Sequence, residues 1–463
     1  MDRSSSRGLR NMTVGSPLGH IFYFALPLLI GSFLQQLYNM VDSWVVGNYV
    51  GDAALAAVGV GFPVIFMFTS MFMGISNGGT VVIAQFYGAG RMDRVRDAVD
   101  TIYTTFVCSV IPVTLLALVL VRPILFLLRV DAGAYHESWV YLIVVCAGLI
   151  GTIGYNTNAG ILNGLGNSRT TLIFLATAAV LNIILDLVLV LACSMGVLGV
   201  ALGTILSQAF SWLFGLFYIN RHYPEIGIRP FCFHFDRGLF KSVMQVGLPA
   251  GIQMSLVSLG AMMVISKVNT FGKPFTAGYN VGLKLDQMAF LAVQSLSSAA
   301  TAYVGQNVGA RKPERVRQGV RVTVVMAVGW SLAMMAVLIP LGPTLVSSFS
   351  HTPEVIEAGS TYLRCIMPFY PLFAVMFSLN ASMRGAGESV FPMVNVVLSL
   401  ILVRVPMVYL LANRYGPGVM FYGIGIGWCV GFVTCVLYYL SGRWKRNSGR
   451  ITGGSAAPGE SPG

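Results

Sequence analysis

The stretch AQFYGAGRMDRVRDAV at residues 84–99 returns as GQNVGARKPERVRQGV at residues 305–320, with seven positions identical in residue type. At the same offset of 221 residues, the turn NGLGNS at 163–168 returns as RGAGES at 384–389. Two separate matches at one spacing indicate that the chain is an internal duplication. Duplicated halves in a membrane protein are typical of transporters.

Composition places the chain in a bilayer. Of its 463 residues 56% are hydrophobic and only 10% are charged, whereas a soluble domain carries about 25% charged residues. Backbone groups in hydrocarbon must be satisfied internally, and the apolar runs are too long for barrel strands, so we expect an all-α integral membrane protein. Twelve transmembrane helices are predicted as two pseudo-symmetric bundles of six, at 18–45, 53–84, 98–122, 138–158, 169–193, 197–220, 241–267, 277–304, 318–343, 358–380, 389–412 and 418–441.

Basic residues indicate the orientation. With the N-terminus inside, 21 of the 29 Lys and Arg residues fall in inside segments and five in outside loops. This asymmetry follows the positive-inside rule, so we expect a multi-pass protein of the cell membrane with both termini cytoplasmic. The cations are spread over many segments without a recognition module, which argues against nucleic acid as a partner. The expected organisation is a cytoplasmic segment at 1–17, a first lobe at 18–220, a linker at 221–240, a second lobe at 241–441 and a basic, then disordered, cytoplasmic tail at 442–463.

Polar residues inside the spans carry the functional signal, because an aspartate at the centre of a span costs about 2.5–3.5 kcal/mol on insertion scales. Asp42 shares one face of its helix with Gln35 and Asn39, and Asn182 shares a face with Asp186 at i and i+4. These oxygens, with Thr204 at a similar depth, suit a proton or a small hard cation such as Na⁺. The alternative is that each aspartate ends its helix and reaches the headgroups.

The second repeat serves as a comparison. Val264 stands opposite Asp42, and Val403 and Met407 stand opposite Asn182 and Asp186. A purely structural role would tend to keep the acids in both halves, so a functional role is favoured.

A different polar stripe marks the second lobe. Lys284 within it either lines a cavity or pairs with a neighbouring acid. Asp286 points to another face of the same helix, and Arg404 lies nearer a helix end, where we expect it to extend to the headgroups. The stripe consists of Asn280, Lys284, Gln287, Gln294 and Ser298.

Three segments carry a resemblance to a known family: FALPLLIGSFLQQLYNMVDSWVVGNYVG at 24–51, the paired AQFYGA and GQNVGA turns, and LNIILD at 181–186. Together they resemble the multidrug and toxin extrusion (MATE) family. The resemblance covers nearly the whole chain except the tail. It implies two six-helix lobes around a V-shaped cavity and antiport of drugs or metabolites, usually organic cations, against H⁺ or Na⁺.

Residue by residue, the resemblance assigns the cation site of the first lobe to Asp42, Asn182, Asp186 and Thr204, with Na⁺ an alternative to H⁺ at the first three. The chain departs from members that hold acids on helices 7 and 10, because it has Gln253, Ser255 and Ser258 on helix 7 and Asn380 on helix 10. A carboxylate site in the second lobe is therefore not expected. Candidate cavity residues are Gln35, Asn39, Gln253, Asn280, Lys284 and Gln287.

We therefore expect a monomeric, ion-driven exporter of small molecules that needs no cofactor and no bound metal beyond the coupling ion. One alternative is a flippase of lipid-linked saccharides, which would have a more cationic central cavity. A membrane-embedded enzyme is the other, but the five histidines fall in loops or at predicted helix ends, and no HExxH or Walker-type motif occurs.

Overall fold

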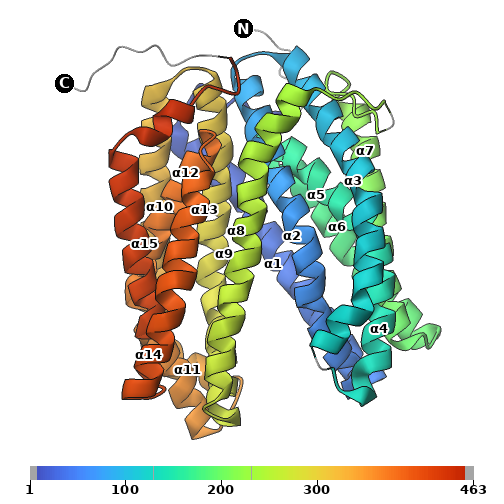
Figure 1. Ribbon diagram of the computed structural model, residues 1–463, viewed down its shortest axis with the longest axis vertical. Helices are drawn as coiled ribbons and strands as arrows, with labels where there is room; N and C mark the ends of the chain where they lie inside the picture. Colours follow the sequence, from blue (N-terminus) through green and yellow to red (C-terminus); the bar gives the residue numbers. More distant parts are fainter. Residues whose placement is uncertain (1–7, 129, 231, 454–463) are drawn as a thin grey trace. The chain divides into compact units, whose positions relative to one another are not determined.

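The computed structural model describes residues 8–128, 130–230 and 232–453, and their secondary structure is helical throughout (Figure 1). The chain forms two compact units. The first comprises residues 1–11 and 26–251, and the second comprises residues 12–25 and 252–463. The division therefore passes through the first helix of each repeat, so that the start of each of these helices belongs to the other unit.

The first unit contains the helices of the first repeat and the start of α8. Backbone amides at two helix starts are capped by side chains: Asp131 accepts from Gly133 N (2.9 Å) and Asn167 from Thr170 N (3.1 Å). The elements are α1 (Pro17–Val45), α2 (Asp52–Gly88), α3 (Met92–Leu127), α4 (Ala132–Ala147), α5 (Leu149–Gly164), α6 (Ser168–Asp186), α7 (Gly196–His222) and α8 (Arg237–Asn269).

Small residues explain why the start of α8 packs within the first unit. Gly74 and Gly78 of α2 face Gly247 and Gly251 of α8, at i, i+4 spacing on both helices. A Cβ at Gly247 would lie 2.8 Å from the carbonyl oxygen of Gly74, so only glycine permits this approach. Such small-residue contacts are a common way of bringing membrane helices together.

The second unit is built around α9, which packs against α10, α11 and α12. The short N-terminal segment also belongs to this unit: Met12 is fully buried, and its backbone N–H donates to Gln306 Oε1 (2.8 Å). The elements are α9 (Lys273–Gly309), α10 (Pro313–Ser347), α11 (Pro353–Ile366), α12 (Tyr370–Gly385), α13 (Val390–Val396), α14 (Arg404–Tyr415) and α15 (Tyr422–Leu440).

The duplication is visible in individual hydrogen bonds. Thr80 Oγ1 donates to the carbonyl of Gly160 (2.9 Å), and Thr301 Oγ1 donates to that of Ala381 (3.0 Å), 221 residues further along at both ends. The turn after α2 and the turn after α9 have the same backbone hydrogen bonds, and the residues with left-handed φ angles, Gly90 (71°) and Arg311 (55°), are equivalent. The repeated motif is therefore a repeated local structure.

The twelve expected spans are all occupied by helices, with differences in how they are built. Ten helical spans among the described residues are long and apolar enough to cross a membrane, and an eleventh is the pair α4 and α5. This pair is bent by 47°, so the span predicted at 138–158 consists of two helices with a break between them. The break is at Gly148, where a Cβ would overlap with Ile205 of α7. The twelfth, α9, is 37 residues long but more polar because of its stripe.

Three spans contain a π-helical segment. One follows α1 at Val46–Val50, one follows α6 at Leu187–Ala192, and one precedes α14 at Val397–Val403. Short π-helical turns within α-helices are uncommon and often mark functional positions. The first two begin within four residues of Asp42 and directly after Asp186, respectively.

The connection between the two repeats and the start of the C-terminal tail lie mostly within the described residues. Between α7 and α8, the described irregular residues are 223–230 and 232–236, and both helices extend into the expected linker at 221–240. It is fixed to α3: Arg229 pairs with Asp100 (2.5 Å), and Asp236 pairs with Arg94 (3.1 Å). The tail begins with a 3₁₀ turn at Arg443–Asn447. The predicted disorder of the tail concerns mainly residues 454–463, which lie outside the described residues.

Candidate cation site

The two acids predicted in the first repeat lie together. Asp42 is on α1 and Asp186 is the last residue of α6, and their carboxyl groups lie close enough to interact electrostatically. Asp186 is fully buried, which contradicts the alternative that it ends in the headgroups. Two neighbouring carboxyl groups in a low dielectric cannot both ionise cheaply, so the pair needs a proton on one of them or a cation between its charges.

The amide of Asn182 completes the group on α6. Its Nδ2 donates a long hydrogen bond to Asp186 Oδ1 (3.5 Å), as expected for residues at i and i+4. Three oxygens of this site are buried and have no hydrogen-bond partner: Asp42 Oδ1, Asn182 Oδ1 and Asp186 Oδ2. A buried acceptor without a donor costs about 1–3 kcal/mol, and more for a charged group. Three such acceptors around one acid pair suit a positively charged ligand.

The part of Thr204 in the cation site stays a prediction. Its hydroxyl donates to the carbonyl of Val200 (3.0 Å) on its own helix, which leaves the lone pairs of its oxygen for a cation. The neighbouring residue, Gly203, lies against the acid, because a Cβ there would overlap with Asp186 Oδ1. The glycine therefore provides the space that the Asp186 carboxyl occupies.

Two tyrosines and a glycine belong to this site and were missed by the sequence reasoning. Tyr141 of α4 is buried and interacts electrostatically with both acids, and Tyr38 of α1 interacts electrostatically with Asp42. Tyr38 could have been found, because it lies four residues before Asp42 on the same helix face. Tyr141 and Gly203 come from other helices, and their sequence gives no comparable signal.

An apolar core closes the site at the ends of α1 and α6. It consists mainly of small β-branched residues, which pack closely around the π-helical segments and leave few polar groups near the acids. Its buried members are Val45, Val46, Ala54, Tyr141, Val145, Val190, Val197, Val200 and Ala201.

The other candidate residues occupy varied positions. Gln35 is exposed and Asn39 is half-buried on α1, while Asn280 and Lys284 are exposed and Gln287 is half-buried on α9. Among the described residues Lys284 forms no ion pair, so the structure does not support its pairing with a neighbouring acid.

Gln253 is placed differently from the exposed candidates. It is 6% exposed within the second unit and accepts a hydrogen bond from Arg384 of α12 (3.2 Å). Its amide therefore faces the interior of that unit.

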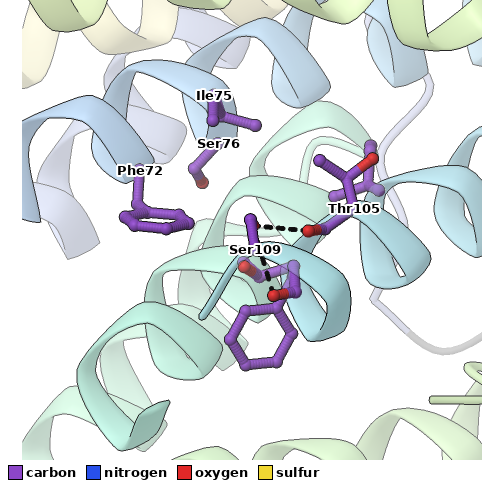
Figure 2. Close-up of a pocket in the computed structure, with 8 residues that line it drawn as sticks. Phe72, Ile75, Ser76, Thr105 and Ser109 are labelled. Carbon is purple, nitrogen blue, oxygen red and sulfur yellow. Dashed lines mark hydrogen bonds between the residues drawn. The ribbon is translucent and has the colours of Figure 1, made fainter. Parts of the chain in front are cut away.

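A small cavity in the first unit lies apart from the acids. Figure 2 shows it between α2, α3 and α5, with Ser76 and Ser109 among its polar lining. Ser76 Oγ donates to the carbonyl of Asn156 (2.6 Å), and the cavity volume is about 10 Å³. That is space for at most one water molecule, so this cavity is not a substrate site.

Comparison with known proteins identifies the fold and the family. The MatE family model matches residues 27–188 and 249–410, one segment in each repeat. The chain is 28% identical to the probable multidrug resistance protein YpnP of Bacillus subtilis, over 94% of this chain and 97% of that protein. It is 26% identical to the probable multidrug resistance protein NorM of Thermotoga maritima, over 92% of each.

A solved structure supports the same conclusion at the level of the fold. The outward-facing conformation of a multidrug resistance MATE family transporter matches with a TM-score of 0.87 at 22% identity, over 97% of this chain and 99% of that one. MATE structures have a twelve-helix fold, in agreement with the twelve spans found here. The chain therefore belongs to the MATE family of membrane efflux transporters and is not an enzyme.

Proposed function

We propose that this protein is a secondary active multidrug exporter, which moves organic and often cationic drugs or metabolites out of the cell by alternating access. The gradient of H⁺ or Na⁺ is its only energy source, and it works as a monomer in the cell membrane with both termini cytoplasmic. The names of its relatives support the drug class. The distribution of basic residues supports the orientation.

One observation carries the coupling part of the proposal: the buried, unpartnered oxygens of Asp42, Asn182 and Asp186 surround one acid pair in a membrane bundle. A proton or Na⁺ that binds there removes the repulsion between two carboxylates. An ion shifts a conformational equilibrium only as far as it prefers one conformation. The π-helical turns next to both acids are elements whose geometry the ion can change.

Efflux measured with separately imposed gradients tests the proposal. Vesicles that contain the protein are loaded with ethidium or norfloxacin, and efflux is followed with a proton gradient alone, a sodium gradient alone, or neither. We expect efflux under at least one gradient and none when both are collapsed. Efflux that continues without any ion gradient would contradict ion coupling.

A further inference from the structure

The second unit contains a half-buried acid, Asp286, with one buried carboxyl oxygen. Asp286 lies in the middle of α9, and its Oδ2 accepts a hydrogen bond from the hydroxyl of Tyr362 on α11 (3.1 Å). The hydroxyl of Tyr370 on α12 donates to the backbone carbonyl of Asp286 (3.4 Å). Its Oδ1 is buried and has no hydrogen-bond partner. This carboxyl lies within a membrane helix, and only one of its two oxygens accepts a hydrogen bond. That is too little to compensate a charged carboxylate.

A half-buried arginine with one buried, unpartnered nitrogen interacts with this acid. Arg404, the first residue of α14, interacts electrostatically with Asp286, but the two form no ion pair in the described structure. The Nε of Arg404 is buried and has no hydrogen-bond partner, while the residue as a whole is half-buried, so the expectation that its guanidinium extends to the headgroups stays a prediction. Its Cβ packs against α15, where a Cβ at Gly427 would lie 2.9 Å away.

Aromatic rings pack around Asp286. Tyr279, Tyr362 and Tyr370 are each at most 2% exposed, and the ring of Tyr362 contacts Phe421 edge-on at 5.1 Å between centroids. The ring of Tyr370 contacts Trp428 of α15 at 5.3 Å. A ligand of any size would have to displace these rings, whereas a proton needs no space.

We propose that Asp286 and Arg404 form a proton-controlled ion pair in the second unit, a second proton site separate from the acids of the first. With a proton on Asp286 the two side chains stay apart, as they are here. When the carboxyl releases its proton, its negative charge draws in the guanidinium, and the two unpartnered atoms satisfy each other. The proton therefore decides whether α9 and α14 are linked by a charge pair.

The backbone before Arg404 provides a means of movement. The π-helical segment Val397–Val403 ends directly at Arg404. Conversion of one π-helical turn to α-helix shifts the register by one residue, which rotates a following side chain by about 100° and moves it by about 1.5 Å. A shift of this size can bring a guanidinium into contact with a carboxylate that it only approaches.

Other titratable groups near Asp286 do not replace Arg404. The phenols of Tyr279, Tyr362 and Tyr370 face the acid, but they are neutral donors at ordinary pH. Lys284 is exposed on a different face of α9. The charged residues of α10 are confined to residues 313–321, next to the opposite end of α9, and those of α11, Glu354, Glu357 and Arg364, are exposed.

The test uses the full-length protein in lipid nanodiscs, with Asp42 and Asp186 both changed to Asn so that the first unit is silent. Infrared difference spectra recorded across a pH series report protonated carboxyl groups directly. In a variant whose other five tryptophans are phenylalanine, Trp428 fluorescence reports movement next to Tyr370. We expect a carboxyl band and a Trp428 transition that titrate together, both lost in Asp286→Asn and retained in Asp286→Glu.

The partner variant makes the test specific. Arg404→Gln should abolish the Trp428 transition, and the double variant Asp286→Asn/Arg404→Gln should be no different from either single variant, because the pair acts as a unit. Lys284→Gln, a charge change on the exposed face of the same helix, should leave both signals unchanged. If the spectra of the parent protein and of Asp286→Asn showed the same titrating carboxyl bands, or if the Trp428 transition survived in Arg404→Gln, the inference would be overturned. Neither result depends on efflux, so failure of the proposed function remains distinguishable.

Discussion

Replacing Asp186 with asparagine removes one negative charge from the acid pair of the first unit and keeps the shape of the side chain. The residue is fully buried at the end of α6, and its Oδ2 has no hydrogen-bond partner. Asparagine fits the same space beside Gly203, so the fold should be retained. We expect gradient-driven efflux to be abolished while the amount of protein in the membrane is unchanged.

The size of the effect follows from the charge that is lost. At an effective dielectric constant of about 20, a unit charge about 4 Å from a bound ion contributes about 4 kcal/mol. Each 1.4 kcal/mol is tenfold in affinity, so this term amounts to about a thousandfold. The amide oxygen of asparagine recovers part of it. We therefore expect the affinity for the coupling ion to fall by about a hundredfold or more.

Efflux of ethidium or norfloxacin from vesicles, with H⁺ and Na⁺ gradients imposed separately, measures the loss. The matched control is Met407→Asn, which introduces an amide at the equivalent position of the second repeat and should be much milder. Asp42→Asn should resemble Asp186→Asn. The double variant should be little worse than either, because two groups that bind one ion lose it together.

One result would refute the reasoning directly. If Asp186→Asn retained near-normal efflux under both gradients, the acid pair of the first unit would not be the coupling site. Strongly additive losses in the double variant would show instead that the two acids act independently.

Three further predictions concern other parts of the chain. Gly203→Ala should reduce coupled efflux at least tenfold by displacing the acid next to it, whereas Gly59→Ala, where a Cβ would meet no atom within 4 Å, should not; equal effects would contradict the packing argument. Asp236 caps α8, and hydrogen bonds from backbone N–H groups, that of Leu239 first, hold the pKa of Asp236 below its ordinary value of 3.8. At pH values above the ordinary pKa of 3.8, Asp236→Ala should therefore destabilise the first turn of α8 by about 1 kcal/mol. The difference should disappear as the pH falls through the lowered pKa, as measured by amide hydrogen exchange. Finally, a variant that keeps Cys232 as its only cysteine should react with an impermeant maleimide from the cytoplasmic side alone, because Cys232 is exposed in the inter-repeat connection. Labelling from outside would contradict the predicted topology.

The sequence by itself determined the membrane class, the helical spans and the duplication. Each is a local property: the transfer free energy of a segment depends on its own side chains, and a repeated motif folds into the same turn, as Gly90 and Arg311 illustrate. The same reasoning singled out Asp42, Asn182 and Asp186, because polar residues in a span are conspicuous and helical periodicity places them on a face.

Only the tertiary structure decided which of these residues meet. The approach of Asp42 to Asp186, the space provided by Gly203 and the contact of Tyr141 depend on packing between helices, which hydropathy and periodicity do not encode. In the second unit, the burial of Asp286 Oδ1 and of Arg404 Nε also depends on helix packing, at positions that the comparison of the two repeats did not examine. Different arrangements of the same apolar helices have the same hydropathy. Close packing between helices decides which arrangement forms, because in a bilayer the arrangements differ mainly in how closely the helices fit.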